Sequence, residues 1–129
     1  MDNPEKPRLT IITPTLNEGG NIHKLMQRID AALSAIKISY QVYFIDDHST
    51  DTTVNEINEL AGRYPIKCFS KEGHRGKGYS IVQGFSLVDT ELVAVLDADL
   101  QYPPEAIPEM IAKIDSGEAD MVITRYVCQ

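Results

Sequence analysis

The stretch VAVLDADLQYPPE, residues 93–105, runs an apolar segment directly into two carboxylates and then into two prolines. The continuous apolar run 92–96 is typical of a strand in a parallel sheet that is covered on both faces. Asp97 and Asp99 follow it at once, and carboxylates are costly to bury unless something pairs with them. The stretch therefore predicts either a water-exposed rim or a cation at the end of a buried strand.

Outward from this stretch, short apolar runs alternate with apolar residues at helical spacing. The expected strands are 9–13, 42–45, 66–70, 92–96 and 121–124. The expected helices lie within 22–36, 54–64, 78–85 and 103–114, and the last begins near Pro103 and Pro104, which suit a first helical turn. This alternation predicts an α/β fold with a Rossmann-like, doubly wound, mainly parallel sheet and helices on both faces. Residues 1–129 form one unit without a linker, and because no helix closes the fifth strand we expect a truncated part of a longer protein.

The composition narrows the classes of partner. The formal net charge is −7, from 12 basic and 19 acidic residues, which argues against nucleic acid as a ligand. No apolar run approaches the roughly 20 residues that a membrane-spanning helix needs. The two cysteines, Cys68 and Cys128, belong to no metal-binding pattern and are typical of reduced thiols. We therefore expect a cytoplasmic chain, and the edge and apolar face left by truncation also allow a homo-oligomer.

A polar cluster follows each of the five expected strands. The clusters are PTLNEGGN, DDHSTDTT, KEGHRGKG, DADLQ and RY. Ligands of parallel α/β sheets bind beyond the carboxyl ends of the strands. We therefore expect the five clusters to converge on one binding site.

Asp97, Asp99 and Gln101 supply oxygen ligands at alternate positions of the DADLQ cluster. Carboxylate and amide oxygens, completed by water and substrate phosphates, suit Mg²⁺ or Mn²⁺. The alternative is that Asp99 caps the next helix while Asp97 accepts hydrogen bonds from loop amides.

In the second cluster, Asp46 and Asp47 could bind a metal, or one of them could contact a nucleobase or ribose. The alternative is a helix cap, which Ser49 or Asp51 could serve equally well. We favour Asp47 as the functional acid of the pair.

The GHRGKG segment, residues 73–78, lacks the spacing of a P-loop, and the chain also lacks the glycine fingerprint of a dinucleotide site. Lys77 or Arg75 could nevertheless approach a diphosphate. The alternative is a flexible loop with a solvated basic face.

Taken together and in this order, TIITPTLNEGGNI, YFIDDHSTDTT, HRGKGYSIVQGF, VLDADLQYPPE and VITRY resemble the family 2 glycosyltransferases of the GT-A fold. The resemblance extends from Leu9 to about Tyr126 and is greatest to the polyprenol-phosphate branch, such as the dolichol-phosphate mannosyltransferases. It implies a metal-dependent, inverting transfer of a sugar from a UDP- or GDP-sugar to a polyprenyl phosphate, at the cytoplasmic face of a membrane in the full-length protein.

The resemblance also implies a role for individual residues. The metal and donor diphosphate would lie among Asp97, Ala98, Asp99 and Gln101, with Asp97, Asp99 and Arg125 as the catalytic residues. The resemblance also implies that Lys77 contacts the diphosphate, but it supports this role less strongly than the others. The nucleotide-binding residues would be Pro14, Leu16, Glu18, Ile45 and Asp47.

Two positions depart from the family pattern. Leu16 replaces the aromatic residue that is frequent in PTYNE, which leaves the base and sugar open, and His48 stands where Gly or Asn is common. Two other functions remain open from the sequence: a fragment that binds nucleotide without turnover, and a phospho-receiver domain, although a receiver carries its acid pair after the first strand.

Overall fold

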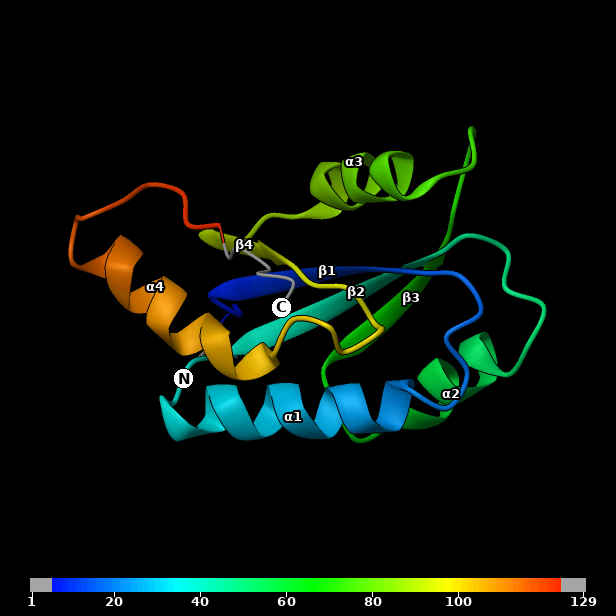
Figure 1. Ribbon diagram of the computed structural model, residues 1–129, viewed down its shortest axis with the longest axis horizontal. Coiled ribbons are helices and arrows are strands. Elements are labelled where there is room, and N and C mark those ends of the chain that lie inside the picture. The colour runs from blue at the N-terminus through cyan, green and yellow to red at the C-terminus, as the bar shows by residue number, and fades with distance from the viewer. Residues whose placement is uncertain (1–5, 124–129) are drawn as a thin grey trace, which may run out of the picture.

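The computed structural model describes residues 6–123, which form a parallel sheet between two unequal helical layers (Figure 1). The strands are β1 (Leu9–Thr15), β2 (Tyr40–Asp46), β3 (Ile66–Ser70) and β4 (Leu92–Val95), and the helices are α1 (Ile22–Ala35), α2 (Thr53–Leu60), α3 (Lys77–Leu87), the 3₁₀ turn η1 (Pro104–Ala106) and α4 (Ile107–Asp115). The strand order is β3-β2-β1-β4, and each neighbouring pair is parallel. The predicted α/β class and mainly parallel sheet are confirmed.

The central strand β1 is buried along almost its whole length. Its sequence LTIITPT is rich in β-branched residues, which suit a pleated and covered surface. Leu9 pairs in register with Tyr40 of β2 on one side and with Leu92 of β4 on the other. Successive side chains of β1 therefore alternate between the two helical layers.

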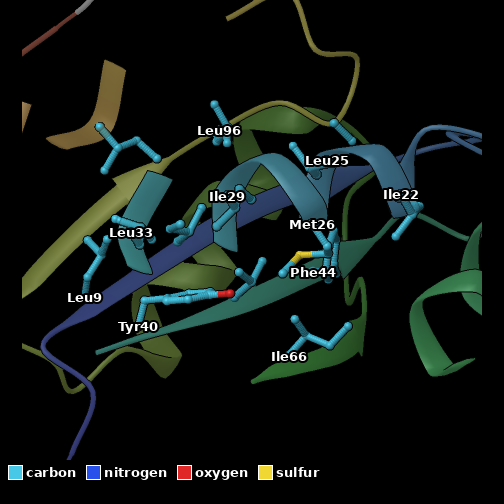
Figure 2. Close-up of a cluster of buried hydrophobic side chains, with 14 of the residues drawn as sticks. Leu9, Ile22, Leu25, Met26, Ile29, Leu33, Tyr40, Phe44, Ile66 and Leu96 are labelled. Atoms are coloured by element: carbon cyan, nitrogen blue, oxygen red, sulfur yellow. The ribbon is translucent and has the colours of Figure 1, made fainter. Parts of the chain in front are cut away.

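The layer formed by α1, α2 and α4 covers one face of the sheet and makes the main core. The apolar stripe of α1 points onto β1 and β2, where it meets Phe44 (Figure 2). Phe44 is completely buried. The helix α1 contributes Ile22, Leu25, Met26, Ile29 and Leu33, all of them fully buried as their helical spacing predicts.

Among the helices of residues 6–123, only α3 covers the opposite face (Figure 1). This helix turns small residues to the sheet: its buried positions are Ser80 and Gly84, and a Cβ added at Gly84 would lie 2.6 Å from Cγ2 of Ile12. The apolar residues Val82 and Phe85 stay 67% and 52% exposed. The close contact of Gly84 with Ile12 of β1, rather than the apolar residues Val82 and Phe85, therefore determines which face of α3 packs on the sheet.

One expected element is wrong in the part of the chain that the structure describes. Residues 121–123 of the expected fifth strand are not in a strand, and Met121 and Ile123 are 76% and 80% exposed. The rest of that strand, and Arg125 with it, lies outside the described residues. Within residues 6–123, no helix has both the length and the apolar character needed to cross a bilayer.

Candidate functional site

The strand order places a topological switch point between β1 and β4, since the chain adds β2 and β3 on one side of β1 and β4 on the other. Parallel α/β sheets bind ligands at this point, beyond the carboxyl ends of the strands. A pocket of about 280 Å³ lies there. Its lining residues are Pro14, Thr15, Leu16, Glu18, Asp47, Gly76, Lys77, Ser80, Asp97, Ala98 and Asp99.

A larger cavity of about 440 Å³ lies near the start of β1 and is lined by Arg8, Lys37, Asp115 and their neighbours. Arg8 is already paired there with Asp115 and Glu91, so its charge is compensated within the chain. None of the four polar clusters that lie within the described residues reaches this cavity. The smaller pocket is therefore the candidate site.

Most residues named from the sequence meet at this pocket. Pro14, Leu16, Glu18, Asp47, Lys77, Asp97, Ala98 and Asp99 line it. Ile45 does not, because it is completely buried in the sheet under α3. Gln101 is exposed and is not a lining residue, and Arg125 lies outside the described residues. Motif reasoning missed Thr15, Gly76 and Ser80, which carry no charge to mark them.

The DADLQ turn holds its two carboxylates in different ways. The Gln101 amide donates to Asp99 Oδ1 at 3.1 Å, and Leu100 between them has a φ of 64°. A bulky residue in the left-handed region is strained, and such strain is common where a turn presents functional groups. Asp97 Oδ2 accepts from Lys77 Nζ at 2.6 Å. The turn therefore pairs Asp97 with the Lys77 ammonium, while Asp99, which lines the pocket, has no hydrogen bond to its second oxygen from the described residues.

The loop after β1 is held by the loop after β2. The Glu18 amide donates to Thr53 Oγ1 at 2.8 Å, and the Gly19 amide donates to Asp51 Oδ2 at 2.9 Å. Hydrogen bonds from Thr53 lower the pKa of Asp51, so this carboxylate stays ionised as a brace. Much of DDHSTDTT is therefore a support for PTLNEGGN.

The two adjacent acids of this cluster point to different places. Asp46 is bonded within the fold: it accepts from Thr15 Oγ1 at 2.7 Å, from the Ser49 amide at 2.8 Å and from Ser49 Oγ at 2.6 Å. Asp47 lines the pocket, and its Oδ2 accepts from the Gly76 amide at 3.1 Å. The geometry thus supports Asp47, rather than Asp46, as the acid that faces a ligand.

His48, next along the chain, has a φ of 59°. Glycine and asparagine are the residues that adopt this left-handed conformation most readily. The positive φ therefore explains why Gly or Asn is favoured at this position. In this chain, His48 adopts the same backbone conformation.

Negative charge is concentrated at the mouth of the pocket. Burial raises the pKa of Glu18, and the nearby carboxylates of Asp99, Asp97 and Asp51 raise it further. A divalent cation at this place would relieve the repulsion among these acids.

The donor set fits a cation that is shared with a substrate. Within residues 6–123 there is no cluster of three or more His, Cys, Asp or Glu residues that could hold a metal ion. Mg²⁺ is commonly bound by one or two carboxylates together with substrate phosphates, rather than by an all-protein cage. Asp97 and Asp99 line an open pocket and match that arrangement, and Lys77 adds a positive charge to the same lining.

Known proteins are similar to this chain in sequence and in fold. The profile described as Glycosyl transferase family 2 matches residues 10–128. The dolichol-phosphate mannosyltransferase of Pyrococcus furiosus is 36% identical over 120 residues, which cover 93% of this chain and 34% of that protein. The chain thus spans about a third of the length of the curated relatives it matches.

Two solved structures extend the likeness to three dimensions. The mannosyltransferase PcManGT from Pyrobaculum calidifontis, in complex with GDP-Man and Mn²⁺, has a TM-score of 0.65 and 25% identity over 80% of this chain and 30% of that one. TarS 1-349 of S. aureus, in complex with UDP-GlcNAc, has a TM-score of 0.64 and 25% identity over 95% and 37%. By motif, architecture and family match, this chain belongs to glycosyltransferase family 2 and has the GT-A fold.

Proposed function

We propose that residues 1–129 are the nucleotide-sugar-binding part of a metal-dependent, inverting glycosyltransferase. The observation that carries the proposal is the meeting of Glu18, Asp47, Asp97 and Asp99 in one pocket at the switch point of the sheet. The relative PcManGT is described with GDP-Man and Mn²⁺, and TarS with UDP-GlcNAc. The donor is accordingly a GDP- or UDP-sugar.

The residues around the pocket divide the work of binding the donor. Asp47 and the loop of Pro14 and Leu16 would hold the nucleoside, and Asp97 and Asp99 would hold Mg²⁺ or Mn²⁺. A divalent cation supplies charge stabilisation to the departing diphosphate. Lys77 adds positive charge on the same side. Its Nζ, which binds Asp97 in this structure, would bind a phosphate oxygen of the donor instead. Gln101 and Arg125 complete the set implied by the family motif.

The acceptor is a polyprenyl phosphate, in keeping with the name of the Pyrococcus relative. A phosphate oxygen of the acceptor attacks the anomeric carbon from the face opposite the leaving group. The bond from that carbon to the donor's β-phosphate oxygen breaks, and its electron pair leaves with the nucleoside diphosphate. The attacking oxygen is anionic near neutral pH, so the step needs no general base. Because such acceptors reside in membranes, the whole protein would work at the cytoplasmic face of one.

A nucleotide-binding chain without turnover is the second candidate, because the chain covers only about a third of its curated relatives. The phospho-receiver interpretation is wrong, since the chain belongs to family 2. The acid pair also follows β2, not the first strand.

Calorimetric titration of the chain with UDP and GDP, with and without Mn²⁺, tests the proposal. We expect Mn²⁺ to strengthen nucleotide binding and Asp99→Ala to remove that gain, which we put at about tenfold or more. Glu109→Ala is the matched control, because it removes an exposed carboxylate on α4. Metal-dependent affinity that survives in Asp99→Ala would refute the assignment of this acid.

A further inference from the structure

The segment between β4 and α4 carries the two carboxylates assigned to the cation, and an ion pair from a helix reaches it near each end. At its start, Lys77 of α3 binds Asp97. At its far end, Arg28 of α1 binds Glu105, which lies in η1 and is the last residue of VAVLDADLQYPPE. The proposed function uses the first pair and gives the second no role.

The pair of Arg28 and Glu105 is bidentate. Nε of Arg28 donates to Oε2 of Glu105 at 3.0 Å, and Nη2 donates to Oε1 at 2.5 Å. Two parallel hydrogen bonds fix the orientation of the guanidinium and the carboxylate as well as their separation. The bonds from Arg28 also lower the pKa of Glu105, so this carboxylate stays ionised at neutral pH. The pair therefore constrains Glu105 more tightly than a single contact between charges would.

Both partners are attached to well-packed parts of the fold. Arg28 lies in α1 between Leu25 and Ile29, which are completely buried in the main core. On the other side, η1 packs on α1, and its first residue, Pro104, is buried. The pair therefore ties the end of the segment to the helix that contributes most to the core.

The DADLQ turn at the start of this segment is held in a strained conformation. Leu100 has a φ of 64°, and its partly buried side chain packs against the main core. A bulky residue stays in the left-handed region only where the surrounding structure holds it there. The same conformation brings the Gln101 amide to Oδ1 of Asp99. The direction of the Asp99 carboxylate therefore depends on contacts that keep the turn from relaxing.

A contribution to stability does not by itself account for the bidentate pair, because exposed ion pairs stabilise proteins little. The side chains of Arg28 and Glu105 are 31% and 53% exposed. Arg8 and Asp115 form a pair of similar exposure, 35% and 44%, beside the start of β1. This second pair lies away from the carboxyl ends of the strands, where the candidate site is. The chain therefore contains a matched comparison for the pair at the turn.

We propose that Arg28 is a positioning residue of the candidate site: its bidentate bond to Glu105 holds the DADLQ turn so that Asp99 faces the pocket in the orientation that binds a divalent cation. This inference rests on the proposed function, because it assumes a cation at Asp99. Arg28 does not line the pocket and acts only through Glu105 and the turn. Its loss therefore changes the metal-dependent part of nucleotide affinity and leaves the metal-independent part as it is.

Calorimetric titration with UDP and GDP, with and without Mn²⁺, tests the inference on Arg28→Met and Glu105→Gln. Each variant should reduce the gain in affinity that Mn²⁺ gives by about threefold or more, with affinity in the absence of Mn²⁺ unchanged. The double variant should lose no more than either single one, because all three break the same pair. Arg28→Lys keeps the charge but not the planar fork, so it should recover only part of the gain.

Arg8→Met is the matched control, because it breaks an equally exposed ion pair away from the turn. It should leave the gain from Mn²⁺ unchanged. Thermal unfolding without ligand should show that Arg28→Met lowers the midpoint no more than Arg8→Met does.

Hydrogen exchange without any ligand tests the position of the turn directly. The Gln101 amide, which donates to Asp99, should exchange about threefold or more faster in Arg28→Met and Glu105→Gln than in the wild type. Arg8→Met should leave this rate unchanged. A faster rate confined to the two turn variants supports a positioning role, which a general loss of stability would not produce.

An undiminished gain from Mn²⁺ in both Arg28→Met and Glu105→Gln would overturn the inference and leave the proposed function intact. An equal reduction in Arg8→Met, or equal losses of affinity with and without Mn²⁺, would also overturn it, since either result indicates a structural role alone. If Mn²⁺ gives the wild-type chain no gain, the metal assignment of the proposed function fails and the inference fails with it. If Arg28→Met does not fold, Glu105→Gln decides, because Glu105 is exposed.

Discussion

The two faces of the sheet differ in how they are covered. On the α1 face, one continuous cluster joins three helices to the strands and includes the completely buried Phe44 and Leu25. On the α3 face, the buried cluster consists of Ile12, Tyr43 and Ile45, with partly buried neighbours. The α1 face therefore holds most of the apolar burial that stabilises the fold.

Of the three buried side-chain polar atoms that lack a hydrogen-bond partner among the described residues, Thr13 Oγ1 belongs to β1, while those of Asp47 and Lys71 lie on the less covered face. Asp47 and Lys71 are buried there without complete pairing, and the pocket opens at the end of the sheet beside the start of α3. Groups positioned for a ligand cost stability in its absence. In this chain, therefore, the α1 face provides most of the stabilising core. The α3 face, together with the carboxyl ends of the strands, forms the candidate site.

The largest expected difference between the two faces is in the free energy of unfolding that is lost when a phenylalanine is replaced by alanine. Phe44→Ala should lower the free energy of unfolding by about 3–5 kcal/mol, because it leaves a cavity in the main core. Phe85→Ala, on the exposed side of α3, should change it by about 0.5 kcal/mol or less. Urea denaturation of both variants measures the two values. Similar losses would contradict the division between the faces.

A smaller effect is expected inside α3 itself. Gly84→Ala should cost about 1–3 kcal/mol, because the new Cβ would overlap Ile12. Gly78→Ala, in the same helix but with no atom within 4 Å of the new Cβ, should gain up to about 1 kcal/mol from helix propensity. The same denaturation series compares them. A stabilised Gly84→Ala variant would show that α3 is not held by close packing on the sheet.

The smallest expected effect concerns the acidic rim. Burial raises the pKa of Glu18 in the folded chain above its unfolded value of about 4.5. The free energy of unfolding therefore falls as the pH rises from the unfolded pKa to the folded pKa. Glu18→Gln should therefore raise the unfolding temperature at pH 7, with a gain that shrinks below about pH 4.5. Thermal unfolding at both pH values measures this, with Glu109→Gln as an exposed control. A gain that is equal at the two pH values would exclude the carboxylate charge as its cause.

Most of the architecture was predictable, because apolar spacing is a local signal. The four described strands and the buried face of α1 follow directly from it. The α3 interface did not follow, since the face that packs is chosen by Gly84 against Ile12, and that contact joins residues far apart in the chain. Residues 121–123, although apolar, are not in a strand, because a strand requires a hydrogen-bonded neighbour as well as suitable residues.

The candidate site was predictable in its general position and less so in its details. Eight of the residues named from motifs line one pocket, because polar clusters that follow parallel strands share one edge of the sheet. Ile45 and Gln101 do not line it: the first is buried under α3, and the second is exposed beyond the turn. Lys71 is the first residue of the KEGHRGKG cluster, but only the structure shows that it is buried and that its amino group lacks a hydrogen-bond partner among the described residues.

By itself, the sequence determined the α/β class, the order of elements and the acidic character of the rim, since each depends on spacing over a few residues. Only the tertiary structure decided that Asp46 is bonded within the fold while Asp47 faces the pocket, and that Lys71 is buried. Those choices depend on strand register and on which layer covers each face. Both are set by packing between segments that are distant along the chain, which no local pattern records.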